Sequence, residues 1–507
     1  MSLAIIHTRA TLGIQAPSVT VEVHISNGLP GLTLVGLPET TVKEARDRVR
    51  SALINSGFTF PAKRITVSLA PADLPKEGGR YDLPIALAIL AASEQIPADK
   101  LTHYEFLGEL ALSGALRRVN GAIPAAIASN LAHRQLILPG ANSHEIGLIP
   151  QGNSWVADHL LAICGFLQGE TTLEKGQSIE YKTNSDKSLD LQDIIGQSQA
   201  KRALEITAAG GHNLLLLGPP GTGKTMLANR LTGLLPPLTD QEALEAAAIN
   251  GLLHSNELPT LWRSRAFRAP HHSASMAALI GGGSIPRPGE ISLAHNGVLF
   301  LDELPEFERR VLDSLREPLE SGEIIISRAA AKVRFPAKVQ LIAAMNPSPS
   351  GHYQGIHNRT PPQQILRYLA KLSGPFLDRF DLSIEVPLLP AGMLGTQKHQ
   401  GENSETVRQR VLRAREKQLG RAGKINSELN SQEISEYCCL APENAVFLEQ
   451  VLLTLGLSVR AWHHILKVAR TIADLALEDN IQKKHLSEAL SYRCMDRLLL
   501  QLHKSLM

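Results

Sequence analysis

The residues best suited to chemistry follow a short apolar stretch at 214–217. The chain continues there as G-x4-G-K-T, which is the phosphate-loop pattern in its required strand-to-helix context. Glycines let backbone amides turn inward onto phosphate oxygens. Lys224 is expected to reach the terminal phosphates, and the Thr225 hydroxyl to ligate magnesium at a helix N-terminus. The residues predicted to bind the nucleotide phosphates are Gly218, Pro219, Pro220, Gly221, Thr222, Gly223, Lys224 and Thr225.

Two later apolar stretches end in polar residues that complete this chemistry. Residues 298–301 read as a buried strand followed by Asp302 and Glu303. We expect Asp302 to hold magnesium and Glu303 to activate the attacking water. The stretch "LIAAMNP" ends in Asn346, which is suited to sensing the γ-phosphate, the alternative being a plain strand-end cap. Together these residues predict ATP hydrolysis.

Length and composition limit the class of protein. A chain of 507 residues is too long for one core and suggests about three domains. Lysine and arginine number 51 against 49 acidic residues, so a nucleic-acid site would require local clustering of charge. The four cysteines lack zinc or disulfide spacing, and neither a signal peptide nor a membrane span is apparent. We therefore expect a cytoplasmic protein with no membrane partner.

The elements that position these residues fall into an α/β order followed by helices. Residues 1–167 predict one α/β domain, with the alternating strand "VTVEVHI" and the buried helix "DLPIALAILAAS". Residues 168–188 are polar and aperiodic and read as a linker. Strands alternate with helices over 189–390, where we expect a parallel sheet. Residues 391–507 predict a helical domain.

The order of these motifs resembles the AAA+ ATPases. In "DIIGQSQAKRAL" the resemblance assigns Ile194 and Ile195 to the wall of the adenine pocket. Arg379 in "SGPFLDRFDL" looks like the arginine finger that such proteins offer to a neighbouring subunit's ATP. Arg460 in "GLSVRAWHHILK" is similar to the second sensor of the helical lid. An arginine acting on a neighbour implies a ring, most often a hexamer.

A basic hairpin is predicted between the two halves of the hydrolysis machinery, at "GEIIISRAAAKVRF". Its position resembles that in minichromosome-maintenance helicases, the magnesium-chelatase ATPase subunit and the motor RuvB. The resemblance implies that Arg328, Lys332 and Arg334 face a central channel and grip DNA phosphates without reading sequence. The alternative is a solvated hairpin whose charges guard against aggregation. A Gly/Pro-rich insert at 281–289 adds Arg287 as a second expected DNA contact.

Two further motifs have weaker chemical readings. His271 and His272 adjoin each other without nearby Cys or Asp partners, so we expect a structural role rather than a metal site. "LAPADLPKEGGRYDLPIALAIL" resembles the Lon-protease fold. It has no Ser, Thr or Cys between Pro75 and Leu90, so nothing at that turn can attack a carbonyl. The first domain is therefore predicted to be Lon-like and non-proteolytic.

Over nearly its full length the chain resembles the YifB/ComM family. The resemblance implies an ATP- and Mg²⁺-dependent homohexameric helicase that branch-migrates recombination intermediates in natural transformation, with DNA and recombinase-bound DNA as partners. One departure concerns "NPSPSGHYQGIHNRT", where many relatives have cysteines in place of Ser348 and Ser350. His352 and His357 are too few ligands for a structural zinc, so no zinc is expected.

Two other functions remain open at this stage. The first is a remodelling chaperone that threads polypeptide, although no aromatic pore loop is evident between Thr225 and Asp302, where Trp262 and Phe267 are expected to pack. The second is a chelatase-type activator, against which we weigh the fused first domain. We rank the DNA motor before the chaperone, and the chaperone before the chelatase activator.

Overall fold

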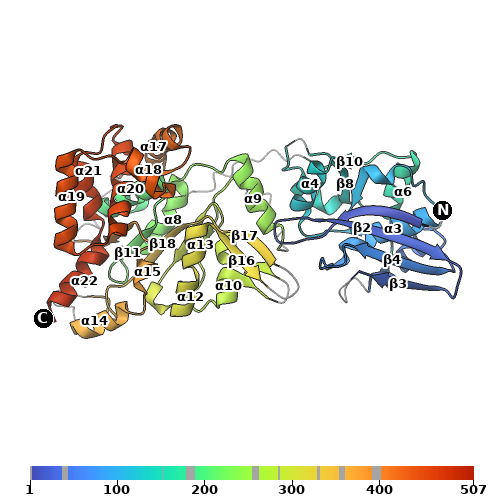
Figure 1. The fold of residues 1–507 in the computed structure, drawn as a ribbon, viewed down its shortest axis with the longest axis horizontal. Helices are drawn as coiled ribbons and strands as arrows, with labels where there is room; N and C mark the ends of the chain where they lie inside the picture. The colour runs from blue at the N-terminus through green and yellow to red at the C-terminus, as the bar shows by residue number, and fades with distance from the viewer. Residues whose placement is uncertain are drawn as a thin grey trace.

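The computed structural model describes residues 3–36, 44–150, 152–177, 189–253, 262–283, 286–327, 332–352, 360–390 and 401–506. An α/β unit formed by the first third of the chain lies at one end of an elongated molecule, and the C-terminal helices lie at the other (Figure 1). A mixed α/β fold with a parallel sheet and a helical C-terminal region is thereby confirmed. In the described part of the chain, every helix is too short or too polar to cross a bilayer.

The first unit is built on an eight-stranded mixed sheet in the order β10-β9-β8-β5-β1-β2-β4-β3. Its strands are β1 (Leu3–Arg9), β2 (Ser18–Ser26), β3 (Gly31–Val35), β4 (Arg64–Ala70), β5 (Tyr104–Phe106), β8 (Gln135–Pro139), β9 (Ser154–Ala157) and β10 (Glu174–Lys175). β1, β2 and β4 pair antiparallel, whereas β1, β5, β8 and β9 pair in parallel. β10 lies within the stretch that the sequence assigns to the linker.

Helices pack against this sheet and bury most of its apolar residues. They are α2 (Ala45–Asn55), α3 (Asp82–Ala92), α4 (Ala122–Leu131), α5 (Ser143–Ile146) and α6 (Leu160–Gln168). Every residue of α3 is buried, which explains why this helix is apolar nearly all round. β6 (Glu109–Leu110) and β7 (Leu116–Arg117) form a small separate ribbon.

The second unit is a five-stranded sheet in the order β12-β15-β18-β11-β19, with every pair parallel. Its strands are β11 (Leu214–Leu217), β12 (Phe267–Arg268), β15 (Val298–Leu301), β18 (Gln340–Met345) and β19 (Leu382–Glu385). Alternate side chains of a strand face opposite sides of the sheet, so Leu214 and Leu215 enter different cores. Because both faces are covered, the central strands β11 and β15 are continuous apolar runs.

One face of this sheet is covered by α7 (Ser198–Gly210), α8 (Lys224–Leu234) and the C-terminal helices, which share a single core. These C-terminal helices are α17 (Ser404–Ala422), α18 (Ser431–Tyr437), α19 (Pro442–Leu455), α20 (Val459–Leu475) and α21 (Lys483–Ser491). The last helix, α22 (Cys494–Lys504), packs instead in the core on the other face, through Met495, Leu498 and Leu502. The other face packs on shorter elements. These are α10 (Met276–Ile280), α11 (Glu290–Leu293), α12 (Arg309–Ser314), α13 (Arg316–Ser321), α14 (Pro362–Leu369), α15 (Gly374–Leu377) and the hairpin of β16 (Glu323–Ser327) and β17 (Lys332–Pro336).

Among the described residues, the two α/β units contact each other through the loop after β1 and through α9. The loop between β1 and β2 brings Gly13 against β17, where a Cβ on Gly13 would lie 2.6 Å from Val333 Cγ1. α9 (Asp240–Asn250) packs on α4, and Gly121 N donates to Gly251 O at 3.0 Å. The first unit therefore contacts both the predicted DNA hairpin and the helix that follows α8.

Candidate active site

The phosphate loop lies between β11 and α8, as the motif predicts. Gly221 and Gly223 have φ values of 78° and 87°, in the left-handed region where a side chain would be strained. A Cβ on Gly218 would lie 2.3 Å from Val386 O. All three positions therefore favour glycine, two because of their positive φ and one because a side chain would clash with a backbone oxygen. The loop geometry therefore fits a nucleotide phosphate group.

Lys224 begins α8 and points back over the loop. Its Nζ donates to Gly218 O at 2.7 Å, to Pro219 O at 2.8 Å and to Asn346 Oδ1 at 3.2 Å. Burial lowers the pKa of Lys224, while the nearby Asp302 carboxylate opposes that shift. All three acceptors are uncharged, so an anionic phosphate would be a better partner for the ammonium.

Parallel strands bring the remaining predicted groups to the same edge of the sheet. Thr225 Oγ1 donates to Asp302 Oδ2 at 2.7 Å, so the two proposed magnesium ligands are already in contact. β15 and β18 are neighbours in the sheet, which places Asp302 and Asn346 at adjacent strand ends. Glu303 has a left-handed backbone with φ 52°. It lines a cavity of about 650 Å³ together with Asn346.

That cavity contains side chains for which the sequence offered no motif. Arg367 and Lys371 line it from α14 and the residues after it, and Lys371 Nζ lies 3.5 Å from Glu306 Oε2. The available signal was a pair of basic residues spaced four apart, in and just after a short helix. Such a pair is common on solvated helices, so the fold alone reveals that it faces Glu303.

The two hydrophobic residues predicted to wall an adenine pocket lie in the segment before α7. Ile194 is buried in the core shared by the sheet and the C-terminal helices, and Ile195 is half-buried. Arg230 of α8 donates to Asp190 O at 3.0 Å, which fixes this segment against the helix that starts at the phosphate loop.

The predicted arginine finger, Arg379, and the predicted second sensor, Arg460, lie near each other. Arg379 Nη2 donates to Glu320 Oε2 at 2.5 Å, so an acidic residue of α13 now holds the predicted finger. Arg460 Nη1 lies 3.7 Å from Asp378 Oδ2, next to Arg379 in the chain. Arg460 is thus placed beside the finger segment.

The hairpin has one apolar face and one basic face. Ile324, Ile326, Val333 and Phe335 are buried in the same core as one face of the ATPase sheet. Lys332 and Arg334 are exposed on the opposite side, with Arg334 Nη1 3.9 Å from Glu323 Oε1.

The remaining predicted DNA contacts lie near the hairpin tip and in the insert. Arg328 lies outside the described residues, which resume at Lys332. Arg287 is exposed in β14 (Arg287–Pro288), which pairs with β13 (Gly281–Gly282).

The segment that follows Asn346 is held by hydroxyl contacts. Ser348 Oγ donates to His352 O at 2.7 Å, and the hydroxyls of Ser350 and Thr360 lie 2.7 Å apart. His357 lies outside the described residues. The absence of zinc remains a prediction.

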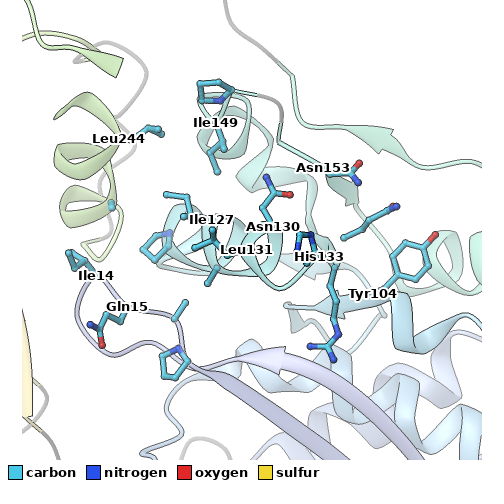
Figure 2. A pocket seen from close by; sticks show the side chains of 18 of the residues that line it. Ile14, Gln15, Tyr104, Ile127, Asn130, Leu131, His133, Ile149, Asn153 and Leu244 are labelled. Atoms are coloured by element: carbon cyan, nitrogen blue, oxygen red, sulfur yellow. The ribbon is translucent and has the colours of Figure 1, made fainter. Parts of the chain in front are cut away.

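A larger groove, of about 1510 Å³, lies between the two α/β units. Figure 2 shows Leu244 of α9 on one side, with Ile127 and Leu131 of α4 across from it. Ile14 and Gln15, from the loop that touches the hairpin, form part of its wall. No sequence motif pointed to this groove, because it is formed by segments far apart in the chain.

Comparison with known proteins places the chain in one family. Family models described as magnesium chelatase subunit ChlI match residues 21–142 and 190–394, and a model of the ChlI C-terminal region matches 401–493. The chain is 62% identical over 506 residues to the uncharacterized protein YifB of Escherichia coli, covering 100% of both chains. It is 63% identical to the competence protein ComM of Haemophilus influenzae, covering 99% of both.

More distant similarity extends to a chelatase subunit. The magnesium-chelatase 38 kDa subunit of Rhodobacter capsulatus is 27% identical over 211 residues, covering 38% of this chain and 54% of that protein. Full-length identity above 60% with YifB and ComM is decisive for membership. The chain therefore belongs to the YifB/ComM family of magnesium-chelatase-like AAA+ ATPases.

Proposed function

We propose that this chain is an ATP-driven DNA motor, a homohexameric branch-migration helicase acting on recombination intermediates in natural transformation. The observation that carries the proposal is the two-faced hairpin: its basic face is exposed, while its apolar face joins the core of the ATPase sheet. β17 leads into β18, and Asn346 directly follows the end of β18 at Met345. A displacement of the hairpin by DNA would therefore be transmitted to Asn346 through β17 and β18.

The ATP site is assigned by its donors and acceptors. Lys224 binds the terminal phosphates, and Thr225 with Asp302 would hold Mg²⁺, which neutralises phosphate charge when bound. Glu303 accepts a proton from the attacking water, and Asn346 orients that water. The contact between Thr225 and Asp302 supports this assignment, because both oxygens already converge on one point. Ile194 and Ile195 contact the adenine.

The ring is assigned through Arg379, which completes the site of a neighbouring subunit after it exchanges the Glu320 carboxylate for phosphate oxygens. Arg460 is assigned as the second sensor of the helical lid. Residues 1–167 form a non-proteolytic Lon-like domain, 168–188 a linker, 189–390 the ATPase core and 391–507 the lid. The competence-protein name of the Haemophilus influenzae relative supports the link to natural transformation and to DNA.

A chelatase-type activator is the second candidate, supported by the named chelatase relatives. The match of residues 21–142 to a ChlI model means that the first domain does not by itself argue against this function. A polypeptide remodeller is the third. Trp262 and Phe267 are both half-buried, and Phe267 stacks on Phe300 at 5.7 Å.

The test measures ATP hydrolysis with and without single-stranded, duplex and four-way-junction DNA, and follows the strands released from the junction. The key variant replaces Arg328, Lys332 and Arg334 by alanine. Its matched control removes three exposed positive charges of the C-terminal helices, at Arg413, Lys483 and Lys504. We expect DNA to stimulate the wild type and the control, but not the hairpin variant, which should keep basal hydrolysis.

DNA binding of the same proteins should depend on salt. Loss of three phosphate contacts should reduce the slope of log K against log salt by roughly 3. Equal behaviour of the hairpin variant and the control would reject the hairpin as the DNA contact. No stimulation of the wild type by any DNA would reject the motor, and stimulation by unfolded polypeptide would favour the third candidate.

A further inference from the structure

The groove between the two α/β units is walled by two helices that each turn one face into it. The lining residues are Pro124, Ile127, Ala128 and Leu131 on α4, and Gln241, Leu244, Glu245 and Ala248 on α9. Both sets follow the i, i+3, i+4, i+7 spacing of a single helix face. The groove volume of about 1510 Å³ exceeds the roughly 300–1000 Å³ of a small-molecule pocket. The groove therefore suits a segment of a polymer.

The two helical walls present aliphatic side chains to this space. Leu131 is 77% exposed, a fraction exceeded among the large apolar residues of the described chain only by Leu29 and Leu453. Ile127 and Leu244 are half-buried and line the same groove. A cluster of exposed aliphatic side chains marks a site of interaction with a partner. The walls thus offer an apolar slot between α4 and α9.

The end of the groove opposite α9 is basic. Figure 2 shows Tyr104 and His133 at that end. Lys100 and His103 come shortly before Tyr104 in the chain, and Arg134 follows His133; all three line the groove. Lys100, His103 and His133 are exposed.

Acidic side chains do not balance this charge. Glu245 is the one carboxylate among the described residues that line the groove, and its Oε2 already lies 3.1 Å from His295 Nε2. Arg134 Nη1 lies 3.4 Å from Glu105 Oε1, but Arg9 donates to both oxygens of that carboxylate at 2.6 Å and 2.7 Å. One carboxylate between two guanidinium groups leaves a positive charge in excess. This end of the groove therefore complements an anionic partner.

We propose that the groove binds an acidic amphipathic helix of a partner protein. The apolar stripe of that helix enters the slot between α4 and α9, and its carboxylates meet the basic end. Single-stranded nucleic acid fits this groove less well, because its bases stack on aromatic side chains. Tyr104 is the only Phe, Tyr or Trp among the described lining residues, and its ring packs edge-on against Phe166 at 5.6 Å.

A partner in the groove also lies beside the hairpin. Ile14 and Gln15 line the groove, and they follow Gly13, which packs on Val333 of β17. Binding of a partner should therefore restrain the loop that contacts the hairpin. The inference goes beyond the proposed motor and does not depend on it, since the groove residues belong neither to the ATP site nor to the basic face of the hairpin.

The experiment uses a fluorescein-labelled synthetic helix of about 15 residues, with leucines along one face and glutamates on the other. Its fluorescence anisotropy is titrated with the full-length protein. A scrambled peptide of the same composition, and the same helix with lysines in place of the glutamates, serve as controls. We expect the wild type to bind the acidic helix and neither control peptide. Bound helix should slow amide hydrogen exchange in α4 and α9.

Two exposed residues of the groove are then substituted, each with a matched control in the same unit. Leu131→Asp should weaken binding at least about tenfold, since it replaces an apolar contact by a negative charge. Leu161→Asp on α6, where the leucine is 49% exposed outside the groove, should bind as the wild type does. Lys100→Glu should weaken binding about threefold to tenfold, unlike Lys63→Glu. All four positions are exposed, so the melting temperatures should stay near that of the wild type.

Three results would overturn the proposal. The first is no binding of the acidic helix by the wild type, or equal binding by Leu131→Asp and Leu161→Asp. The second is protection of α4 and α9 by oligothymidylate that is lost in Lys100→Glu but kept in Leu131→Asp, which would assign the groove to nucleic acid. The third is self-association of the wild type that Leu131→Asp abolishes, without binding of the acidic helix, which would assign the groove to a second copy of the chain.

Discussion

Two lysines in glycine-rich turns show how differently the α/β units use similar sequences. Lys224 follows the phosphate-loop glycines, and Lys76 precedes Gly78 and Gly79 in "PKEGG". Both are buried, and burial lowers the pKa of each. Both donate to backbone carbonyls, Lys76 to that of Pro71. Local sequence and local burial therefore do not separate them.

Lys224 and Lys76 differ in the polar groups that neighbouring strands place beside them. Asp302 and Asn346 arrive beside Lys224 from β15 and β18. The charges near the first turn are instead paired: Arg48 donates to Asp82 at 2.8 Å and 3.0 Å.

The first sheet shows the same pattern deeper in its core. Arg9 donates to fully buried Glu105 at 2.6 Å and 2.7 Å. In the first unit these buried charges stabilise the fold, whereas we propose that those around Lys224 in the second unit are arranged for a ligand.

The largest expected difference comes from substituting each of these two lysines in turn. Lys224→Ala should lower kcat for ATP at least about 100-fold, since it removes a cation aimed at the transferred phosphate, while the melting temperature stays near that of the wild type. Lys76→Met should leave kcat per folded molecule unchanged and lower the unfolding free energy by about 1–3 kcal/mol, because Pro71 O loses its donor. Steady-state kinetics and urea unfolding measure the two effects. If Lys76→Met lost ATP hydrolysis while keeping wild-type stability, the assignment of Lys76 to the fold alone would be wrong.

The next effect tests how the first unit touches the second. Gly13→Ala places a methyl group in a left-handed backbone 2.6 Å from Val333 Cγ1, so β17 must shift. Gly57→Ala is the matched control, with φ 82° but open space around its Cβ. Both should lose about 1–2 kcal/mol to backbone strain.

Amide hydrogen exchange distinguishes the two glycine variants. Only Gly13→Ala should accelerate exchange in β17, by roughly 5- to 30-fold for a similar loss of local stability. Equal exchange at Val333 and Phe335 in both variants would show that the loop does not support the hairpin.

The bounds of two central strands of the ATPase core were predicted correctly from the sequence, and there is a physical reason for this. Strands 214–217 and 298–301 are buried on both faces and have no polar interruption, so their ends coincide with the polar residues that follow. The hairpin was predicted from β-branched residues on either side of a short basic tip, and β16 and β17 pair antiparallel there.

Contacts between distant segments could not be predicted in this way. The 3.2 Å approach of His272 to Glu303 and the pairing of Arg379 with Glu320 depend on how separate elements pack. No periodicity within either segment encodes its partner. The interdomain groove was missed for the same reason.

The smallest effect concerns a buried carboxylate that serves the fold within the ATPase unit. Burial alone would raise the pKa of Asp381, but His464 and His212 hold it well below its usual value. Asn213 N also donates to Asp381 Oδ2 at 3.1 Å. His464 belongs to α20, so this cluster ties the sheet to the C-terminal helices.

The pH dependence of that cluster follows from the sign of the shift. A depressed folded-state pKa contributes stability above the unfolded value, near pH 4, and the contribution is lost as pH falls through the folded value. Asp381→Asn should therefore flatten the dependence of the urea midpoint on pH below about pH 4, because it removes the titrating group. Its hydrolysis rate per folded molecule at neutral pH should match the wild type. A large fall in kcat without loss of stability would instead place Asp381 with the ligand-binding charges around Lys224, and the division between the two kinds of buried charge would fail.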